Sequence, residues 1–287
     1  RKQMTTVVGD NIHNLAVQGN FDDCQAMVKA SFNDKSFLPA DRSLVAVNSI
    51  NWARIMAQIV YYFYAAVALG SPGRKLAFSV PTGNFGDMAK QMGLPVERLI
   101  IATNSNDVLH RVLTTGSYGR QSLQHTLSPS MDISVSSNFE RLLFDLYGRD
   151  GAAIKDLMSR FEQGDISFSE TAMAQLSGLF SSHCVDDTET CAQMAATWNS
   201  CEYMLDPHSA IGVNAALAAR LPAGVPVVTL ATAHPAKFPA AVKAAGLDAE
   251  PVLPHHLRDL FDRPERCEVL PNELAAVHAF MADNINA

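Results

Sequence analysis

The segment Pro81 to Asp87 (PTGNFGD) combines residue types that can hold an anion. It follows a short apolar run and precedes a short helical pattern, so backbone N–H groups and the positive end of a helix meet at one point. Gly83 and Gly86 allow a ligand to approach the backbone, while Thr82 and Asn84 add neutral donors. The loop has no lysine and lacks the glycine spacing of a dinucleotide fingerprint, which favours a compact monophosphate. The alternative is an ordinary strand-to-helix turn.

A second polar group follows the apolar run from Val225 to Ala231. Thr232 stands at the end where a parallel strand meets its ligand, and a hydroxyl there can hydrogen-bond a heterocycle nitrogen without protonating it. As an alternative, Thr232 caps the next helix. Lys237 follows closely, but nothing in the sequence indicates the depressed pKa that an amine nucleophile needs, so a surface lysine is the better interpretation.

A third candidate site is the segment that opens the long apolar pattern after residue 47. It carries amide, hydroxyl and guanidinium groups that suit a phosphate or carboxylate at a helix N-terminus, namely Asn48, Ser49, Asn51 and Arg54. The alternative is a well-capped helix in which Ser49 bonds its own backbone. The turn Asp206-Pro207-His208-Ser209 could supply a base, although a histidine in a turn more often makes local hydrogen bonds.

The elements that position these groups alternate between strand and helix. Apolar runs typical of buried strands occur at 75–80, 98–103 and 225–231, with helical patterns between them. Such alternation predicts an α/β fold with a mostly parallel sheet, whose ligands gather at the carboxyl ends of the strands. The pattern from Ile50 to Leu69 is apolar nearly all round, which predicts a helix buried on most faces.

Composition narrows the class of function. The chain has 287 residues, enough for one large or two ordinary domains, with 48% hydrophobic and 18% charged residues. A net charge of −7 without clusters argues against nucleic-acid binding. The longest apolar stretch is too short and too interrupted to span a bilayer, and no apolar leader follows Arg1-Lys2-Gln3. Five cysteines without paired spacing favour a reducing cytoplasm, and the histidines and carboxylates show no metal-ligand spacing.

Six separated segments, in this order, resemble threonine synthases of the bacterial and fungal type: VNSINWARIMAQIVYYF, SVPTGNFGD, MGLPVERLIIATNSND, LSPSMDISVSSNFERLLF, DPHSAIGV and TAHPAKFP. The resemblance implies a fold-type II pyridoxal-phosphate enzyme, similar in architecture to the tryptophan synthase β chain. It further implies a carbon–oxygen lyase that converts O-phosphohomoserine and water to threonine and phosphate, the last step of threonine biosynthesis. A monomer or homodimer would be expected.

The resemblance also implies roles for particular residues. In the family, the loop matching Gly83-Asn84-Phe85-Gly86 holds the cofactor phosphate, and the position matching Thr232 faces the pyridine nitrogen. The segment that carries Asn48, Ser49, Asn51 and Arg54 lies toward the substrate. Residues 1–48 would then be the remainder of a smaller N-terminal α/β domain, and residues 49–287 the larger domain that binds the cofactor phosphate.

Two departures from the family pattern leave alternatives open. The Schiff-base lysine stands in a Lys-Asp-Phe context in the family, and a Ser-Gly-Asp-Thr-Gly loop takes the substrate carboxylate; this sequence has neither motif. We expect both upstream of residue 1. The helix after Asp87 is also shorter than the family's, as if residues were missing there. The alternatives are another fold-type II lyase, such as a threonine dehydratase relative, or a non-catalytic homologue that binds phosphate-bearing ligands.

Overall fold

The chain forms two compact units in the computed structural model, which describes residues 1–47, 51–82 and 93–285. The first unit combines Arg1–Ala46 with Val252–Ala287, and the second is Val47–Pro251. The sequence-based division differs from these units, because it assigned residues 252–287 to the larger domain. The cause is a pairing between strands at opposite ends of the chain, which local patterns do not reveal.

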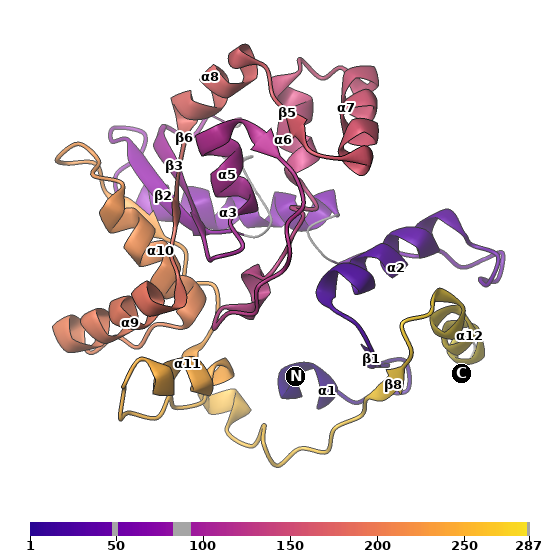
Figure 1. Ribbon diagram of the computed structural model, residues 1–287. Coiled ribbons are helices and arrows are strands. Elements are labelled where there is room, and N and C mark those ends of the chain that lie inside the picture. The colour runs from indigo at the N-terminus through magenta and orange to yellow at the C-terminus, as the bar shows by residue number, and fades with distance from the viewer. Residues whose placement is uncertain (48–50, 83–92, 286–287) are drawn as a thin grey trace. The chain divides into compact units, whose positions relative to one another are not determined.

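The first unit is built around that pairing. Strand β1 (Leu15–Val17) runs parallel to β8 (Glu268–Leu270), and α12 (Leu274–Asn284) contacts α2 (Phe21–Asn33), as Figure 1 shows. The unit also contains α1 (Lys2–Thr5) and the 3-10 helix η3 (His255–Leu257). Asn20 and Asp23 bond each other's backbone N–H groups at the start of α2, which is a capping box.

A parallel four-stranded sheet forms the centre of the second unit. Its strands follow the order β6 (Phe180–Cys184), β3 (Val96–Thr103), β2 (Leu76–Pro81) and β7 (Val227–Thr229). The predicted parallel sheet is therefore confirmed. Strand β7 is shorter than the predicted run from residue 225, since Pro226 has no N–H group for the ladder and joins only through its carbonyl, which accepts from the Ala77 amide.

The two faces of the sheet carry different side chains. On one face Phe78 packs against Tyr62 of α3 (Trp52–Ala68), with ring centroids 4.7 Å apart, in a large apolar cluster that includes α5 (Val108–Thr115). On the other face small residues, such as Ala77 and Ser79, lie under α10 (Pro207–Ala218). Figure 1 shows α10 and α5 on opposite sides of the strands.

The remaining elements surround this sheet. The helices are α6 (Phe139–Leu146), α7 (Gly151–Gln163), α8 (Glu170–Leu179), α9 (Asp187–Cys201) and α11 (Pro239–Ala244). The short pieces are β4 (Ser117–Tyr118) and β5 (Ile166–Ser167), which pair antiparallel, with 3-10 helices η1 (Pro129–Met131) and η2 (Pro235–Lys237). Across the part of the chain described, no helix combines the length and apolar character needed to cross a bilayer.

The expectation that the long apolar helix is buried on most faces is wrong. Helix α3 buries one stripe, formed by Ile55, Ile59, Tyr62 and Ala66. A second apolar stripe at similar spacing is exposed, namely Trp52, Met56, Val60, Tyr64 and Val67. The physical reason is geometric, because a helix laid on a sheet covers it with a single face.

Close packing of α10 on the sheet depends on Gly212. A side chain there would place its Cβ 2.8 Å from Thr229 Cγ2 and 2.9 Å from Pro81 Cγ, closer than real Cβ contacts. Ser79 also donates a hydrogen bond to the Gly212 carbonyl at 2.6 Å, so the helix cannot move away without losing it. The glycine therefore sets the distance between α10 and the strands.

Replacing Gly212 with alanine is expected to lower the free energy of unfolding by about 1–3 kcal/mol, because the added methyl overpacks this contact. Gly178 in α8 is the matched control, since nothing lies within 4 Å of a Cβ built there. Gly178→Ala should be neutral or stabilising by up to about 1 kcal/mol, as expected for a helical glycine. Urea denaturation of both variants measures the difference, and equal effects would contradict the packing argument.

Candidate functional site

Two of the predicted site segments follow strands, β2 and β7, that are parallel neighbours, so their carboxyl ends lie side by side in the sheet. The first is the end of β2, where the Thr82 amide donates to the Ala102 carbonyl at 2.8 Å and its hydroxyl donates to the Val80 carbonyl at 2.6 Å. Thr82 is buried, and its hydroxyl proton is used inside the protein. The expectation that Thr82 offers this hydroxyl as a donor to an anion is therefore wrong.

Several predicted site residues lie outside the described part of the chain. These are Gly83, Asn84, Phe85 and Gly86 of the anion loop, together with Asn48 and Ser49. Their assignments stay predictions, as does the shortened helix after Asp87. The structure does show that β2 leads directly into the loop, because the strand extends to Pro81.

Thr232 lies three residues beyond the end of β7, with an exposed side chain. Its backbone N–H donates to the hydroxyl of Ser209 at 3.1 Å, which fixes the main chain at this point. The following 3-10 helix is capped by His234, whose Nδ1 accepts from the Ala236 amide at 3.2 Å. The alternative that Thr232 caps the next helix is therefore wrong.

Ser209 in turn belongs to a buried polar cluster at the start of α10. Asp206 is the N-cap of the helix, and its carboxylate accepts from the His208 amide at 3.0 Å and from His208 Nδ1 at 2.8 Å. The Ser209 hydroxyl makes a short hydrogen bond to the other carboxylate oxygen. His208 Nε2 accepts from the Ser130 amide at 3.2 Å.

These contacts determine the charge states within the cluster. An amide can only donate, so His208 Nε2 is an acceptor and the proton of the neutral ring is on Nδ1. Burial acts to raise the pKa of Asp206, but the hydrogen bonds from His208 and Ser209 outweigh it, so that the pKa lies below its usual range. Both ring nitrogens of His208 are engaged locally, which supports the interpretation as a hydrogen-bonding residue over that of a free base.

A second buried network stands at the carboxyl end of β3, where sequence reasoning had singled out no site. Asn104 Nδ2 donates to Asp132 Oδ1 at 2.8 Å and to Thr126 Oγ1 at 2.9 Å. Asn106 Nδ2 donates to the same Asp132 oxygen at 3.0 Å, and the Thr126 amide donates to Asp132 Oδ2 at 3.0 Å. The network ties the long polar segment around residues 124–132 to the sheet edge. The only sequence signal for it was membership of two of the six family-like segments.

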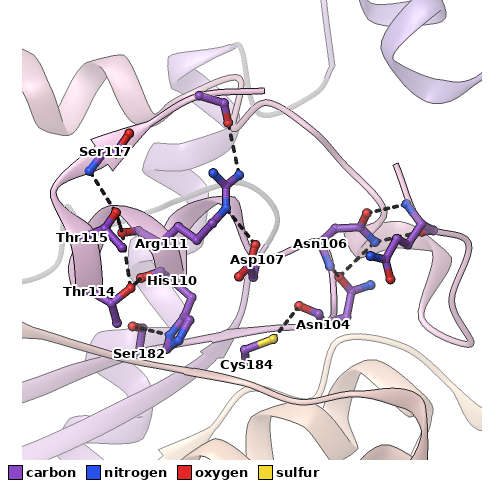
Figure 2. Close-up of polar contacts among 12 residues, drawn as sticks. Asn104, Asn106, Asp107, His110, Arg111, Thr114, Thr115, Ser117, Ser182 and Cys184 are labelled. Carbon is purple, nitrogen blue, oxygen red and sulfur yellow. Dashed lines mark hydrogen bonds and ion pairs between the residues drawn. The ribbon is translucent and has the colours of Figure 1, made fainter. Parts of the chain in front are cut away.

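Beside this network, the start of α5 carries three ionisable groups, of which His110 faces β6. Figure 2 shows Arg111 reaching Asp107, at 2.9 Å, and His110 Nδ1 facing Ser182 Oγ, also at 2.9 Å. Cys184 directs its thiol toward the Asn104 carbonyl at 3.2 Å. Burial lowers the pKa of His110 and the neighbouring His183 lowers it further, while Asp107 acts in the opposite direction.

A pH-dependent stability follows for His110. Its pKa in the folded protein lies below the reference value of 6.5, so between those two values the unfolded chain binds more protons. Stability contributed by neutral His110 is therefore complete above 6.5 and falls as the pH drops through that window. His110→Gln should reduce the difference between urea midpoints measured at about pH 7.5 and about pH 5.5. The exposed His256→Gln is the control, and an unchanged difference in His110→Gln would contradict the assignment.

The start of α3 places two of the predicted substrate residues. The Asn51 side-chain oxygen accepts from the Ala53 amide at 2.9 Å, so Asn51 caps the helix. Arg54 lies in the first turn with an exposed side chain. Their contact with substrate stays a prediction. In the described ranges, no three histidine, cysteine or carboxylate side chains are grouped to hold a metal ion.

Comparison with known proteins gives a consistent result. Residues 209–281 match the family model described as "Threonine synthase, C-terminal". The chain is 58% identical to a threonine synthase of Pseudomonas aeruginosa over all of its own length and 62% of that protein's. It is 43% identical to the Saccharomyces cerevisiae threonine synthase, over 85% of the chain and 52% of that protein.

Solved structures agree with the sequence relatives. The PLP-bound threonine synthase of Brucella melitensis superposes with a TM-score of 0.89 at 51% identity, covering 100% of the chain and 62% of that structure. The yeast threonine synthase gives a TM-score of 0.85 at 37% identity, covering 99% of the chain and 62% of that structure. The resemblance inferred from the six segments is confirmed, and so is the α/β fold it implied. The chain spans about three fifths of the length of these relatives.

Proposed function

We propose that this chain, which is related to threonine synthases over its whole length, supplies the phosphate-binding and pyridine-facing parts of a pyridoxal-phosphate enzyme of that kind. The reaction is the conversion of O-phosphohomoserine and water to threonine and phosphate. The observation that carries the proposal is the high identity to threonine synthases, in sequence and in fold, over 100% of the chain. The unpaired cysteines support a cytoplasmic setting.

The geometry around Thr232 fits the cofactor. The exposed hydroxyl lies just beyond the carboxyl end of β7, and within the described residues no carboxylate is hydrogen-bonded to it. A hydroxyl can meet a pyridine nitrogen without transferring a proton to it, whereas a carboxylate would favour the protonated ring. Pyridoxal phosphate, when bound, supplies an electron sink for negative charge that develops on the substrate carbons.

The phosphate of the cofactor is assigned to the loop Gly83-Asn84-Phe85-Gly86. Support comes from β2, which directs the chain into this loop at the edge where parallel strands collect their ligands. Backbone N–H groups at such a position hold an anion without a lysine. In this proposal the loop holds the phosphate end of the cofactor, and the Thr232 hydroxyl faces the pyridine ring.

The substrate is assigned to the start of α3. Arg54 presents a guanidinium in the first turn, where the positive end of the helix also favours an anion. Asn51 holds that turn by capping it, and Asn48 and Ser49 precede it in the chain. These four residues would bind and orient the phosphate or carboxylate of O-phosphohomoserine.

The lysine that carries the cofactor is proposed to lie upstream of residue 1. No Lys-Asp-Phe motif occurs in these 287 residues. Lys237, the lysine nearest Thr232 in sequence, is exposed on η2, with its ammonium group 5.9 Å from the Phe238 ring centre. This position is that of a surface lysine, and it lacks the burial that an amine nucleophile requires.

Incubation of the full-length gene product with O-phosphohomoserine tests the proposal. We expect threonine and inorganic phosphate in equal amounts, dependent on added pyridoxal phosphate. Formation of an oxoacid and ammonia from threonine, without turnover of the phosphorylated substrate, would instead identify a dehydratase. Cofactor binding with no turnover of either substrate would identify a non-catalytic homologue. Thr232→Asp, prepared in the same way, is the control for a contaminating enzyme. A contaminant would give the same activity in both preparations.

A further inference from the structure

The loop that follows β7 is held by a hydrogen-bonded chain that begins in the core. Asp206 bonds the Ser209 hydroxyl, and the same hydroxyl accepts from the Thr232 amide at 3.1 Å. Asp206 and Thr232, the two ends of this chain, are separated in sequence by α10 and β7, so the chain joins the start of α10 to the loop after β7. It ends at the residue assigned to the cofactor ring.

The direction of these hydrogen bonds is determined by chemistry. A carboxylate can only accept and a backbone amide can only donate, so the single proton of Ser209 must point to Asp206. Its lone pair is then directed at the Thr232 amide. A hydroxyl between two groups of fixed polarity cannot rotate without losing one bond, so the Thr232 main chain has a defined anchor.

The anchor itself is rigid because it is buried and fully bonded. Asp206 is 1% exposed, Ser209 2% and His208 3%. His208 holds the second carboxylate oxygen through Nδ1 at 2.8 Å and receives the Ser130 amide at Nε2 at 3.2 Å. The cluster thus connects the start of α10 with η1 and with the loop after β7. Burial of a carboxylate is costly unless it is satisfied in this way.

We propose that Ser209, oriented by Asp206, is a positioning residue for the cofactor: it fixes the Thr232 main chain so that the Thr232 hydroxyl meets the pyridine nitrogen. The inference rests on the proposed function for the identity of the ligand. Neither residue contacts the reacting atoms, and both act through Thr232. The hydrogen bond to the Thr232 amide joins two atoms of the protein, so it can be tested separately from cofactor binding.

The test compares Ser209→Ala with Ser169→Ala in the full-length protein. Ser169 is a matched control, because its hydroxyl also accepts a backbone amide, that of Ala172 at 3.2 Å, but it caps α8 and has no link to Thr232. Hydrogen–deuterium exchange of the cofactor-free protein should become faster in the peptide that contains Thr232 for Ser209→Ala alone. The dissociation constant for pyridoxal phosphate should rise about tenfold, the effect of losing roughly one hydrogen bond of average strength.

Two further variants separate positioning from general damage. Ser209→Thr keeps the hydroxyl and should restore both exchange and cofactor affinity. Asp206→Asn removes the charge that orients the hydroxyl. Its exchange rate at the Thr232 peptide and its dissociation constant for pyridoxal phosphate should lie between those of Ser209→Ala and the unmodified protein. Asp150→Asn is the control for Asp206→Asn. The Asp150 carboxylate also caps a helix, α7, by accepting from two backbone amides, and its replacement should leave the exchange rate of the Thr232 peptide unchanged. If Ser209→Ala does not fold, Asp206→Asn provides the same two readouts.

Each outcome decides the proposal. Unchanged exchange at Thr232 in Ser209→Ala would overturn the anchor. Faster exchange with unchanged cofactor affinity and an unchanged absorbance spectrum would overturn its role in positioning the cofactor. An unmodified protein that binds no pyridoxal phosphate would refute the proposed function instead, while the exchange measurement would still show whether Ser209 holds Thr232.

Discussion

Replacing Thr232 with aspartate is expected to lower kcat of the full-length protein about 100-fold, the usual scale for removing a preorganised group at a reacting centre. A carboxylate at this position would favour the protonated form of the pyridine ring, whereas the neutral hydroxyl leaves the ring nitrogen unprotonated. The substitution would therefore change the electron distribution of the cofactor ring. The side chain is exposed, so the fold should tolerate the change. Steady-state kinetics with O-phosphohomoserine, combined with cofactor titration, measures the effect.

Thr232→Ser is the control for this substitution. It keeps the hydroxyl and the backbone amide that donates to Ser209, and it should retain kcat within a few-fold. The aspartate variant should still bind pyridoxal phosphate, because the phosphate loop is unchanged. A kcat for Thr232→Asp equal to that of the unmodified protein would show that this position does not face the ring.

Replacing Asp132 with alanine is expected to lower the free energy of unfolding by about 3 kcal/mol, because buried donors lose a charged acceptor. The donors left without it are Asn104 Nδ2 and Asn106 Nδ2, together with the hydroxyl and amide of Thr126. Losing these hydrogen bonds would release the polar segment around residues 124–132 from the sheet edge. Thermal and urea denaturation give the size of the effect.

Asp156→Ala is the matched control for Asp132. It also removes a hydrogen-bonded carboxylate, the one that pairs with Arg160 at 3.1 Å, but both side chains are more than half exposed. Exposed helical pairs contribute about 0.3–0.5 kcal/mol, so the control should differ little from the unmodified protein. Similar losses in the two variants would show that the buried network adds no more than a surface pair.

Local sequence patterns predicted the strands whose own residues form a continuous apolar run. Strands β2 and β3 were expected from continuous apolar runs, and both lie at the centre of the sheet, where such runs are needed. Strand β6 was not predicted, since Ser181, Ser182 and His183 interrupt the apolar pattern. Its strand conformation follows from parallel pairing with β3, a contact between distant parts of the chain. The pairing of β1 with β8 was hidden for the same reason.

The site shows the same division between local and distant information. Thr232 could be singled out because it follows an apolar run, and the structure places it beyond the strand end with its side chain exposed. Its link to Ser209 joins residues 23 positions apart and depends on how α10 packs on the sheet, which no local pattern encodes. Asn51 could be recognised as a helix-start residue, but its role as the cap required coordinates.

We propose that this chain binds pyridoxal phosphate through the loop after β2 and Thr232, while the attachment lysine lies elsewhere in the polypeptide. Borohydride reduction of the full-length holoprotein, followed by mass-spectrometric peptide mapping, tests it most directly. We expect the modified lysine in a peptide outside these 287 residues. A modified Lys237, or any other modified lysine of this chain, would contradict the account.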